Sequence, residues 1–203
     1  MKYILVKQSI IFPLGAMLCL MLAALAVPGY SSISQHLSDL EVLDSPLAMI
    51  SRIAAIVNGI SIVLFGIGVL LISPSRFVLT AITAFLGGAS MISNGVFITG
   101  DPRHGLYAMA IFLVLVPACF AAEFGEDQRI SRLCLFAAVL TMLYFWLQFS
   151  NFDPNGYKGL TQRIAMLVMF GWYSIAGLAL LRSSLVPARA APLPLAEPSR
   201  DMS

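Results

Sequence analysis

Charged residues are scarce in this sequence. Only 11% of its 203 residues are Asp, Glu, Lys or Arg, whereas 59% are hydrophobic. A mean hydropathy of +0.90 is too high for a water-soluble domain, which would have to expose large apolar patches. The net charge of +2 is small and scattered, so nucleic acid is not expected as a partner. The composition predicts a single membrane domain.

Cysteine is also scarce and forms no pattern. Cys19, Cys119 and Cys134 all lie within apolar runs, and none belongs to a CxxC motif. A thiol in such surroundings most often behaves as a small apolar residue. Neither a disulfide framework nor a cysteine-based metal site is therefore expected, and the sequence names no cofactor.

Long hydrophobic runs, in contrast, are abundant. A transmembrane helix needs roughly 20 mainly apolar residues, and six runs qualify. They cover residues 9–27, 47–72, 77–98, 104–124, 131–149 and 160–181. The sequence therefore predicts an all-α protein with a six-helix transmembrane bundle over residues 1–181. The first run is longer than the roughly 7–15 residues of a cleavable signal, which favours an uncleaved first span.

The distribution of Lys and Arg predicts the orientation. A cytoplasmic amino terminus places most of the 12 basic residues on the inner side, as the positive-inside rule requires. Both termini are then cytoplasmic. Residues 182–203 are rich in proline and lack apolar periodicity, so we predict a disordered cytoplasmic tail there.

The first outer connection, residues 28–46, has an amphipathic pattern. Its apolar stripe comprises Ile33, Leu37, Leu40 and Leu43. This spacing predicts a short amphipathic helix that lies along the membrane surface or caps the bundle. Ser32 followed by Gln35 has the form of a capping box at the start of that helix.

Both histidines and several acids fall in the outer connections. The candidate catalytic residues are His36, Asp39, Asp101 and His104. Together they would supply a general acid–base pair, or two histidines and a carboxylate for a metal ion. The alternative is a set of hydrated interfacial side chains. Ser32, His36 and Asp39 also form a ladder along one helix face, but catalytic triads are normally assembled from separate elements, which favours a solvated face.

Three acids stand close to a proline. They are Asp44 in Asp44-Ser45-Pro46, Asp101 before Pro102, and Asp153 before Pro154. An acidic cap followed by proline in the first turn is typical of a helix start, because the carboxylate accepts otherwise unpaired N–H groups. This pattern predicts that the three acids cap helices.

Polar residues within or next to the spans are candidates for ligand binding. They are Arg52, Asn58, Asn94, Arg103 and Arg163. Ionisable groups at membrane depth are costly and often functional. Arg52 and Arg163 lie near the outer ends of their spans, where they would pair with an outer acid or bind an anion or lipid headgroup. The two asparagines are expected to form hydrogen bonds between helices.

Small residues recur every seven positions along the third span, at Ala81, Gly88 and Gly95. Such a spacing places them on one helix face, where two backbones can approach closely. We therefore expect this span to be central to the bundle.

Four segments carry a resemblance to a known family. They are residues 30–40 (YSSISQHLSDL), Ser45-Pro46, Asn58-Gly59 and residues 100–105 (GDPRHG). With these segments the chain resembles the bacterial membrane family catalogued as domain of unknown function 998. In that family an Asp and a following His come after the third span, where Asp101 and His104 stand here. The resemblance implies a six-helix bundle in the bacterial inner membrane, distantly similar to the DRAM-like proteins, without an established reaction.

Three functions remain open at this point. The first is binding of a lipid, a small amphiphile or a partner membrane protein at the outer face. The second is a membrane-embedded hydrolase or transferase that uses the histidines and acids listed above as catalytic candidates. The third is a small transporter, although broken spans and midplane charges are absent apart from Asn58 and Pro117.

Overall fold

The computed structural model describes residues 2–43, 45–106 and 109–185, and within these ranges the chain is helical without a β-strand. The α-helices are α1 (Lys2–Lys7), α2 (Phe12–Ala24), α3 (Ala48–Ile72), α4 (Val78–Val96), α5 (Phe112–Phe124), α6 (Gln128–Phe149) and α7 (Lys158–Leu185). Three short 3-10 helices join them: η1 (Gln8–Ile10), η2 (Leu37–Val42) and η3 (Met109–Ile111).

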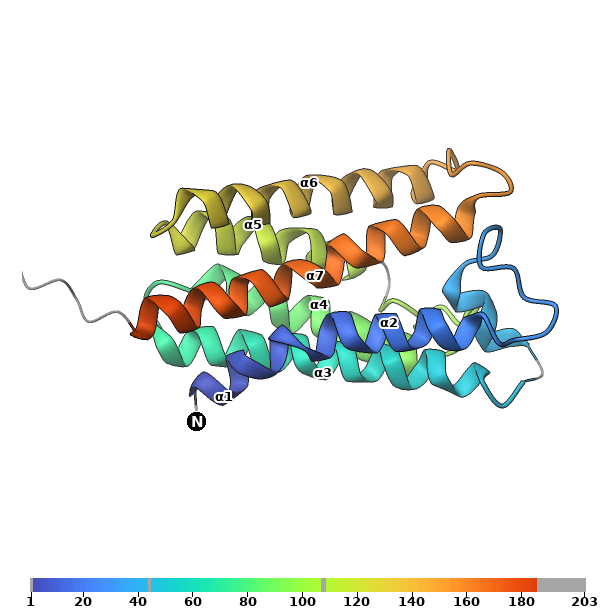
Figure 1. Ribbon diagram of the computed structural model, residues 1–203, viewed down its shortest axis with the longest axis horizontal. Coiled ribbons are helices and arrows are strands. Elements are labelled where there is room, and N and C mark those ends of the chain that lie inside the picture. The colour runs from blue at the N-terminus through green and yellow to red at the C-terminus, as the bar shows by residue number, and fades with distance from the viewer. Residues whose placement is uncertain (1, 44, 107–108, 186–203) are drawn as a thin grey trace, which may run out of the picture.

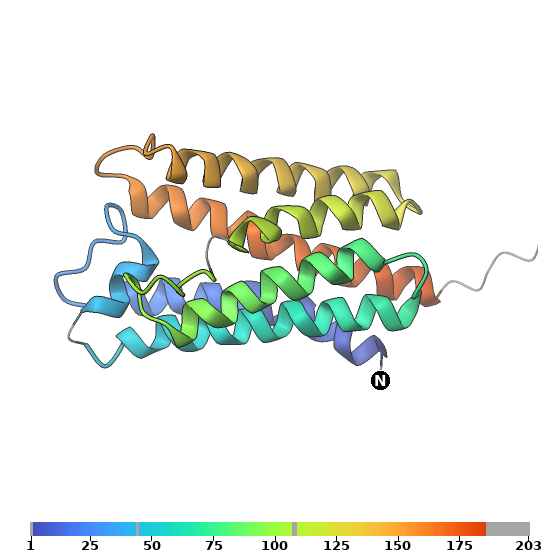
Figure 2. The same ribbon diagram turned by 180° about the vertical axis from the view of Figure 1, so that it is seen from behind.

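The helices form an elongated bundle and run alternately up and down (Figure 1). The start of α1 and the end of α7 lie at the same end, which we call the terminal end. The connections that contain residues 25–43, 97–106 and 150–157 gather at the opposite end, which we call the loop end (Figure 2). The chain runs between the two ends an even number of times, so the start of α1 and the end of α7 lie together.

Five helical segments are long and apolar enough to cross a membrane. They are Lys2–Ala24, Ala48–Ile72, Val78–Val96, Gln128–Phe149 and Lys158–Ser183. The segment Met109–Phe124 is apolar but shorter. The chain is thus an all-α, multi-pass membrane protein, as the sequence predicts. Five of the six predicted spans have a full-length helix, and the fourth has a short one.

The fourth span begins later than the sequence predicts. It was expected from residue 104, but the backbone turns at Gly105 (φ +72°) and Leu106 (φ +49°), which no α-helix accommodates. Two hydroxyls of α4 hold this loop: Ser93 Oγ donates to the Arg103 carbonyl (2.7 Å) and Ser90 Oγ to the Gly105 carbonyl (2.9 Å). At about 1.5 Å per residue α5 is only about 20 Å long, so it begins well inside the bundle (Figure 2).

Helices α3 and α4 are in backbone contact, as the repeat of small residues predicts. A Cβ atom added to Gly59 of α3 would lie 2.5 Å from the Gly88 carbonyl oxygen, and one added to Gly88 would lie 2.7 Å from the Gly59 oxygen. A Cβ on Gly95 would likewise collide with the Arg52 carbonyl. Only glycine permits this approach, which fixes how the two helices present their side chains at the loop end.

The predicted amphipathic helix is reduced to a short 3-10 helix of six residues. Only residues 37–42 are helical, as η2, and Ile33 is exposed. The Ser32 capping box is wrong: the Gln35 side chain accepts the N–H of Ser31 (2.6 Å) instead. The segment before η2 is tied to α7, since the Leu160 N–H donates to Ile33 O (3.0 Å). Leu37 and Leu40 are buried, so η2 caps the bundle.

Two further predictions concern the ends of elements. Helix α7 continues to Leu185, so the predicted tail does not begin at residue 182. Residues 186–203, for which we predict disorder, and Asp44, for which we predict a helix cap, lie outside the described residues.

Candidate functional site

A cavity of about 310 Å³ lies in the half of the bundle nearest the loop end. Side chains from η2 and from helices α2 to α7 line it, and most of them are apolar. The methionines among them are Met17, Met91, Met166 and Met169. Methionine side chains are flexible and polarisable, so they adapt to ligands of irregular shape. The cavity has the size and character of a small-molecule site.

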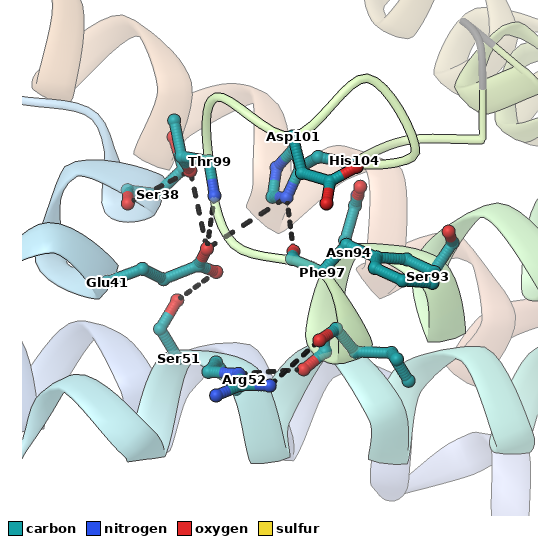
Figure 3. A network of polar contacts seen from close by, with 12 residues as sticks. Ser38, Glu41, Ser51, Arg52, Ser93, Asn94, Phe97, Thr99, Asp101 and His104 are labelled. Carbon is teal, nitrogen blue, oxygen red and sulfur yellow. Dashed lines mark hydrogen bonds and ion pairs between the residues drawn. The ribbon is translucent and has the colours of Figure 1, made fainter.

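One acid, Glu41, lies in the wall of this cavity (Figure 3). It follows the buried Leu40 in η2, and only 3% of its side chain is exposed. Glu41 Oε2 accepts hydrogen bonds from the N–H (3.1 Å) and the hydroxyl (3.3 Å) of Thr99, and Oε1 accepts one from Ser51 Oγ (3.4 Å). Burial raises the pKa of Glu41, against the opposing effect of these bonds and of His104.

His104 lies beside Glu41 and also lines the cavity (Figure 3). Its Nδ1 is 2.8 Å from the Phe97 carbonyl oxygen and 3.9 Å from Glu41 Oε2. Because a carbonyl oxygen can only accept, Nδ1 carries a proton. In the neutral ring, Nε2 is then a hydrogen-bond acceptor. The wall therefore combines a buried carboxylate with an imidazole whose tautomer is fixed by the backbone.

The nearby Arg52 does not neutralise Glu41. Its Nε donates to the Gly95 carbonyl (3.0 Å) and its Nη2 to the Val96 carbonyl (2.8 Å), so it caps the carboxyl end of α4. Arg163 is bound similarly, to the carbonyls of Gln35 (3.2 Å) and Gly159 (2.8 Å). We predicted that these arginines would pair with an outer acid, or bind an anion or lipid headgroup. Among the described residues neither arginine pairs with a carboxylate, so the first of these two roles is wrong.

Asp101 and Arg103 pair with each other. Arg103 Nη2 lies 2.8 Å from Asp101 Oδ2, and the guanidinium stacks 4.0 Å from the centre of the Phe97 ring. The hydrogen bonds from Arg103 lower the pKa of Asp101 to about 2. Asp101 also accepts the N–H of Arg103 (2.8 Å), so it stabilises a turn and not the start of a helix, which corrects the predicted cap.

The side chain of His36 lies beside Asp153, whereas the sequence grouped His36 with Asp39. Its Nε2 is 3.6 Å from Asp153 Oδ2, and Asp153 has a side chain only 4% exposed. Neither carboxylate oxygen of Asp153 accepts a hydrogen bond within the described chain. Helix α7 starts later, at Lys158, so the predicted cap by Asp153 is also wrong. Asp39 accepts the N–H of His36 (2.8 Å) as a local brace of η2.

The structure thus divides the four candidate catalytic residues among three places. His104 lies with Glu41, Asp101 with Arg103, and His36 with Asp153 and Asp39. Within the described ranges, no three His, Cys, Asp or Glu side chains are grouped so as to hold a metal ion. The metal site considered from His36, Asp39 and His104 is not assembled.

The two asparagines differ in their surroundings. Asn94 lines the cavity, and its Oδ1 has no hydrogen-bond partner in the described part of the chain. Asn58 is fully buried in the middle of α3, and neither atom of its amide has a described partner. The predicted hydrogen bond between helices is therefore not formed by Asn58.

The comparisons with known proteins place the chain in a family. A family model described as "Protein of unknown function (DUF998)" matches residues 10–179. The chain belongs to the DUF998 family. This membership confirms the resemblance seen in the sequence, and the match contains every residue that lines the cavity. No curated protein and no solved structure shows significant similarity to the chain.

Sequence reasoning did not select Glu41 as a site residue of this DUF998 chain. Its signal is weak: an acid directly follows Leu40, the second buried position of the apolar stripe. Its role depends on Thr99 and His104, which are about 60 positions away in the sequence and which a kinked loop brings to it. The pair of Glu41 and His104 can therefore be identified only from the path of that loop in the structure.

Proposed function

We propose that this DUF998 protein binds a small amphiphile in the cavity at the loop end of its bundle. The polar head of the ligand would lie at Glu41, Asn94 and His104, and its apolar part would lie along the methionines. This proposal refines the expectation of lipid or amphiphile binding at the outer face. It moves the ligand from the surface arginines into the bundle.

The observation that carries the proposal is the buried carboxylate in a mostly apolar cavity. Removing a carboxylate from water costs several kcal/mol in order of magnitude unless a partner compensates for it. Glu41 has three hydrogen bonds of 3.1 to 3.4 Å and no arginine or lysine partner among the described residues. A polar ligand head at this wall would supply the missing compensation, and the cavity beyond it would hold the ligand's hydrocarbon.

The location of the site supports a ligand that comes from the bilayer or from the outer side. We propose that the protein resides in a bacterial inner membrane with both termini in the cytoplasm, since most of its basic residues then lie inside. The loop end and its cavity would face outward. A membrane lipid or a lipid-soluble compound reaches such a site directly.

Filling the cavity tests the proposal. Ala55 and Ala110 both line the cavity, whereas Leu135 is an exposed residue of α6 outside it. The wild type and the variants Ala55→Phe, Ala110→Phe and Leu135→Phe would be isolated in polymer nanodiscs, and their bound small molecules identified by mass spectrometry. We expect a molecule that is retained by the wild type and Leu135→Phe and lost from both cavity variants. Identical profiles in all four proteins would contradict the proposal.

A membrane-embedded hydrolase or transferase is the second candidate, because of the fixed tautomer of His104. With Nδ1 bound to the Phe97 carbonyl, Nε2 can accept a proton from a bound substrate. Glu41 at 3.9 Å would stabilise the imidazolium that results. An ester and amide hydrolysis screen with the wild type, His104→Gln and His36→Gln checks this candidate. Turnover lost only in His104→Gln supports it, and no turnover in the wild type counts against it.

A further inference from the structure

We infer that the cavity selects amphiphiles that carry a primary ammonium head over those with a carboxylate or phosphate head. This inference rests on the proposed function and names the chemical class of its ligand. It follows from the charges at the cavity wall, from the hydrogen-bonding groups left free there, and from the engagement of the neighbouring arginines.

The charge at the wall is one-sided. Glu41 is the only acid lining the cavity, and no Lys or Arg is found among the lining residues that the structure describes. The two nearest arginines are bound elsewhere, Arg52 to carbonyls of α4 and Arg103 to Asp101. An anionic head beside Glu41 would meet a like charge without a compensating cation, which is strongly unfavourable in an apolar cavity. A cationic head would form an ion pair with Glu41 that no Lys or Arg of the described lining provides.

Several groups at this wall can accept hydrogen bonds from a ligand. They are the carboxylate of Glu41, Nε2 of His104 in the tautomer set by the Phe97 carbonyl, and Oδ1 of Asn94, which has no partner in the described chain. The hydroxyl of Tyr144 can accept as well as donate. A primary ammonium carries three N–H donors and no acceptor. An alcohol offers one donor, and a carboxylate none. The ammonium therefore matches the wall in both charge and donor number.

The other polar groups of the lining do not reverse this preference. Gln162 uses Oε1 to accept the N–H of Leu37 (2.6 Å), and Gln148 is a second neutral amide on α6. Amides donate hydrogen bonds but bring no charge, so they cannot neutralise a phosphate or a carboxylate. They lie on helices α6 and α7.

An amphiphile with a primary ammonium has two sources in a membrane. One is a free alkylamine, and the other is the ethanolamine head of a phospholipid. Both present the same group to Glu41, and the experiment distinguishes them by the mass of the retained molecule.

The test compares matched probes on the purified full-length protein. Binding of n-decylamine, n-decanol and n-decanoate would be measured by native mass spectrometry for the wild type, Glu41→Gln and Glu126→Gln. Glu126 pairs with Arg76 outside this cavity, so its variant is a control with the same change of charge. We expect n-decylamine to bind the wild type at least about tenfold more tightly than n-decanol, with n-decanoate weakest. Glu41→Gln should bind the amine and the alcohol equally, and Glu126→Gln should behave as the wild type.

A second arm identifies the source. The same proteins would be placed in nanodiscs of phosphatidylethanolamine or of phosphatidylglycerol. A phosphatidylethanolamine adduct that Glu41→Gln loses supports the inference with the lipid as source. Amine binding without such an adduct supports it with a free amine as source.

The failures are separable. If the wild type binds n-decanol and n-decylamine equally, or if Glu41→Gln keeps the preference for the amine, the selection of ammonium is overturned and amphiphile binding stands. If none of the probes binds and the cavity-filling variants retain the same molecules as the wild type, both proposals fail.

Discussion

At the scale of single residues, the decisive side chain is Glu41. It is held by Ser51 of α3 and by Thr99 and His104 of the connection 97–106. Of the arginines that the sequence offered as ligands, Arg52 and Arg163 bind backbone carbonyls and Arg103 pairs with Asp101. Among the described residues that line the cavity, Glu41 is thus the one acid.

The stability of the protein should depend on the titration of Glu41. Burial raises its pKa above the ordinary 4.5, so the folded state holds the proton more tightly than the unfolded state. Stability from this group is therefore full below pH 4.5 and declines as the pH rises through the raised pKa. Because glutamine does not titrate, Glu41→Gln should gain stability relative to the wild type as the pH increases.

Thermal unfolding in detergent between pH 4.5 and pH 8 measures this difference. Asp101→Asn is the informative control. Arg103 lowers the pKa of Asp101 to about 2, so this carboxylate does not titrate in that window. A difference between Glu41→Gln and the wild type that stays constant across the window would contradict the raised pKa.

At the scale of elements, the α3–α4 pair is the frame on which the site is built. α4 supplies Asn94 and the hydroxyls that tether the loop carrying His104, and α3 supplies Ser51. Their separation is set by glycines in backbone contact. The site therefore depends on a packing interface that has no polar chemistry of its own.

Alanine at Gly59 should destabilise the bundle by about 1–3 kcal/mol, the usual cost of overpacking. Its added methyl would lie 2.5 Å from the Gly88 carbonyl oxygen, which belongs to the backbone and cannot rotate away. Alanine at Gly171 in α7 is the matched control, because a Cβ there meets no atom within 4 Å. Chemical denaturation of the two variants in detergent measures the effect. Equal stabilities would contradict the packing described here.

The elements also show how far sequence reasoning reaches. Helical spans, their order and the glycine contact follow from hydrophobic length and spacing, which are local properties. The late start of α5 does not, because it depends on Ser90 and Ser93 donating to carbonyls of a loop fifteen and ten positions away. The acid caps at Asp101 and Asp153 fail for other reasons: Asp101 binds Arg103 within a turn, and Asp153 lies beside His36, which is far away in the sequence.

At the scale of the whole molecule, the short fourth span and the capping 3-10 helix at residues 37–42 leave a cavity in the half of the bundle nearest the loop end. The bundle of apolar helices therefore contains a cavity with one polar wall. The central claim is that this cavity, and not the lipid-facing surface, receives an amphiphile.

Photolabelling tests that claim most directly. A decylamine that carries a diazirine on its alkyl chain would be irradiated with the protein in nanodiscs, and the labelled residues mapped by peptide mass spectrometry. We expect label on the cavity methionines Met17, Met91 and Met166, with loss of that label in Ala55→Phe. Label confined to lipid-facing residues such as Leu135 and Phe136, unchanged in Ala55→Phe, would contradict it.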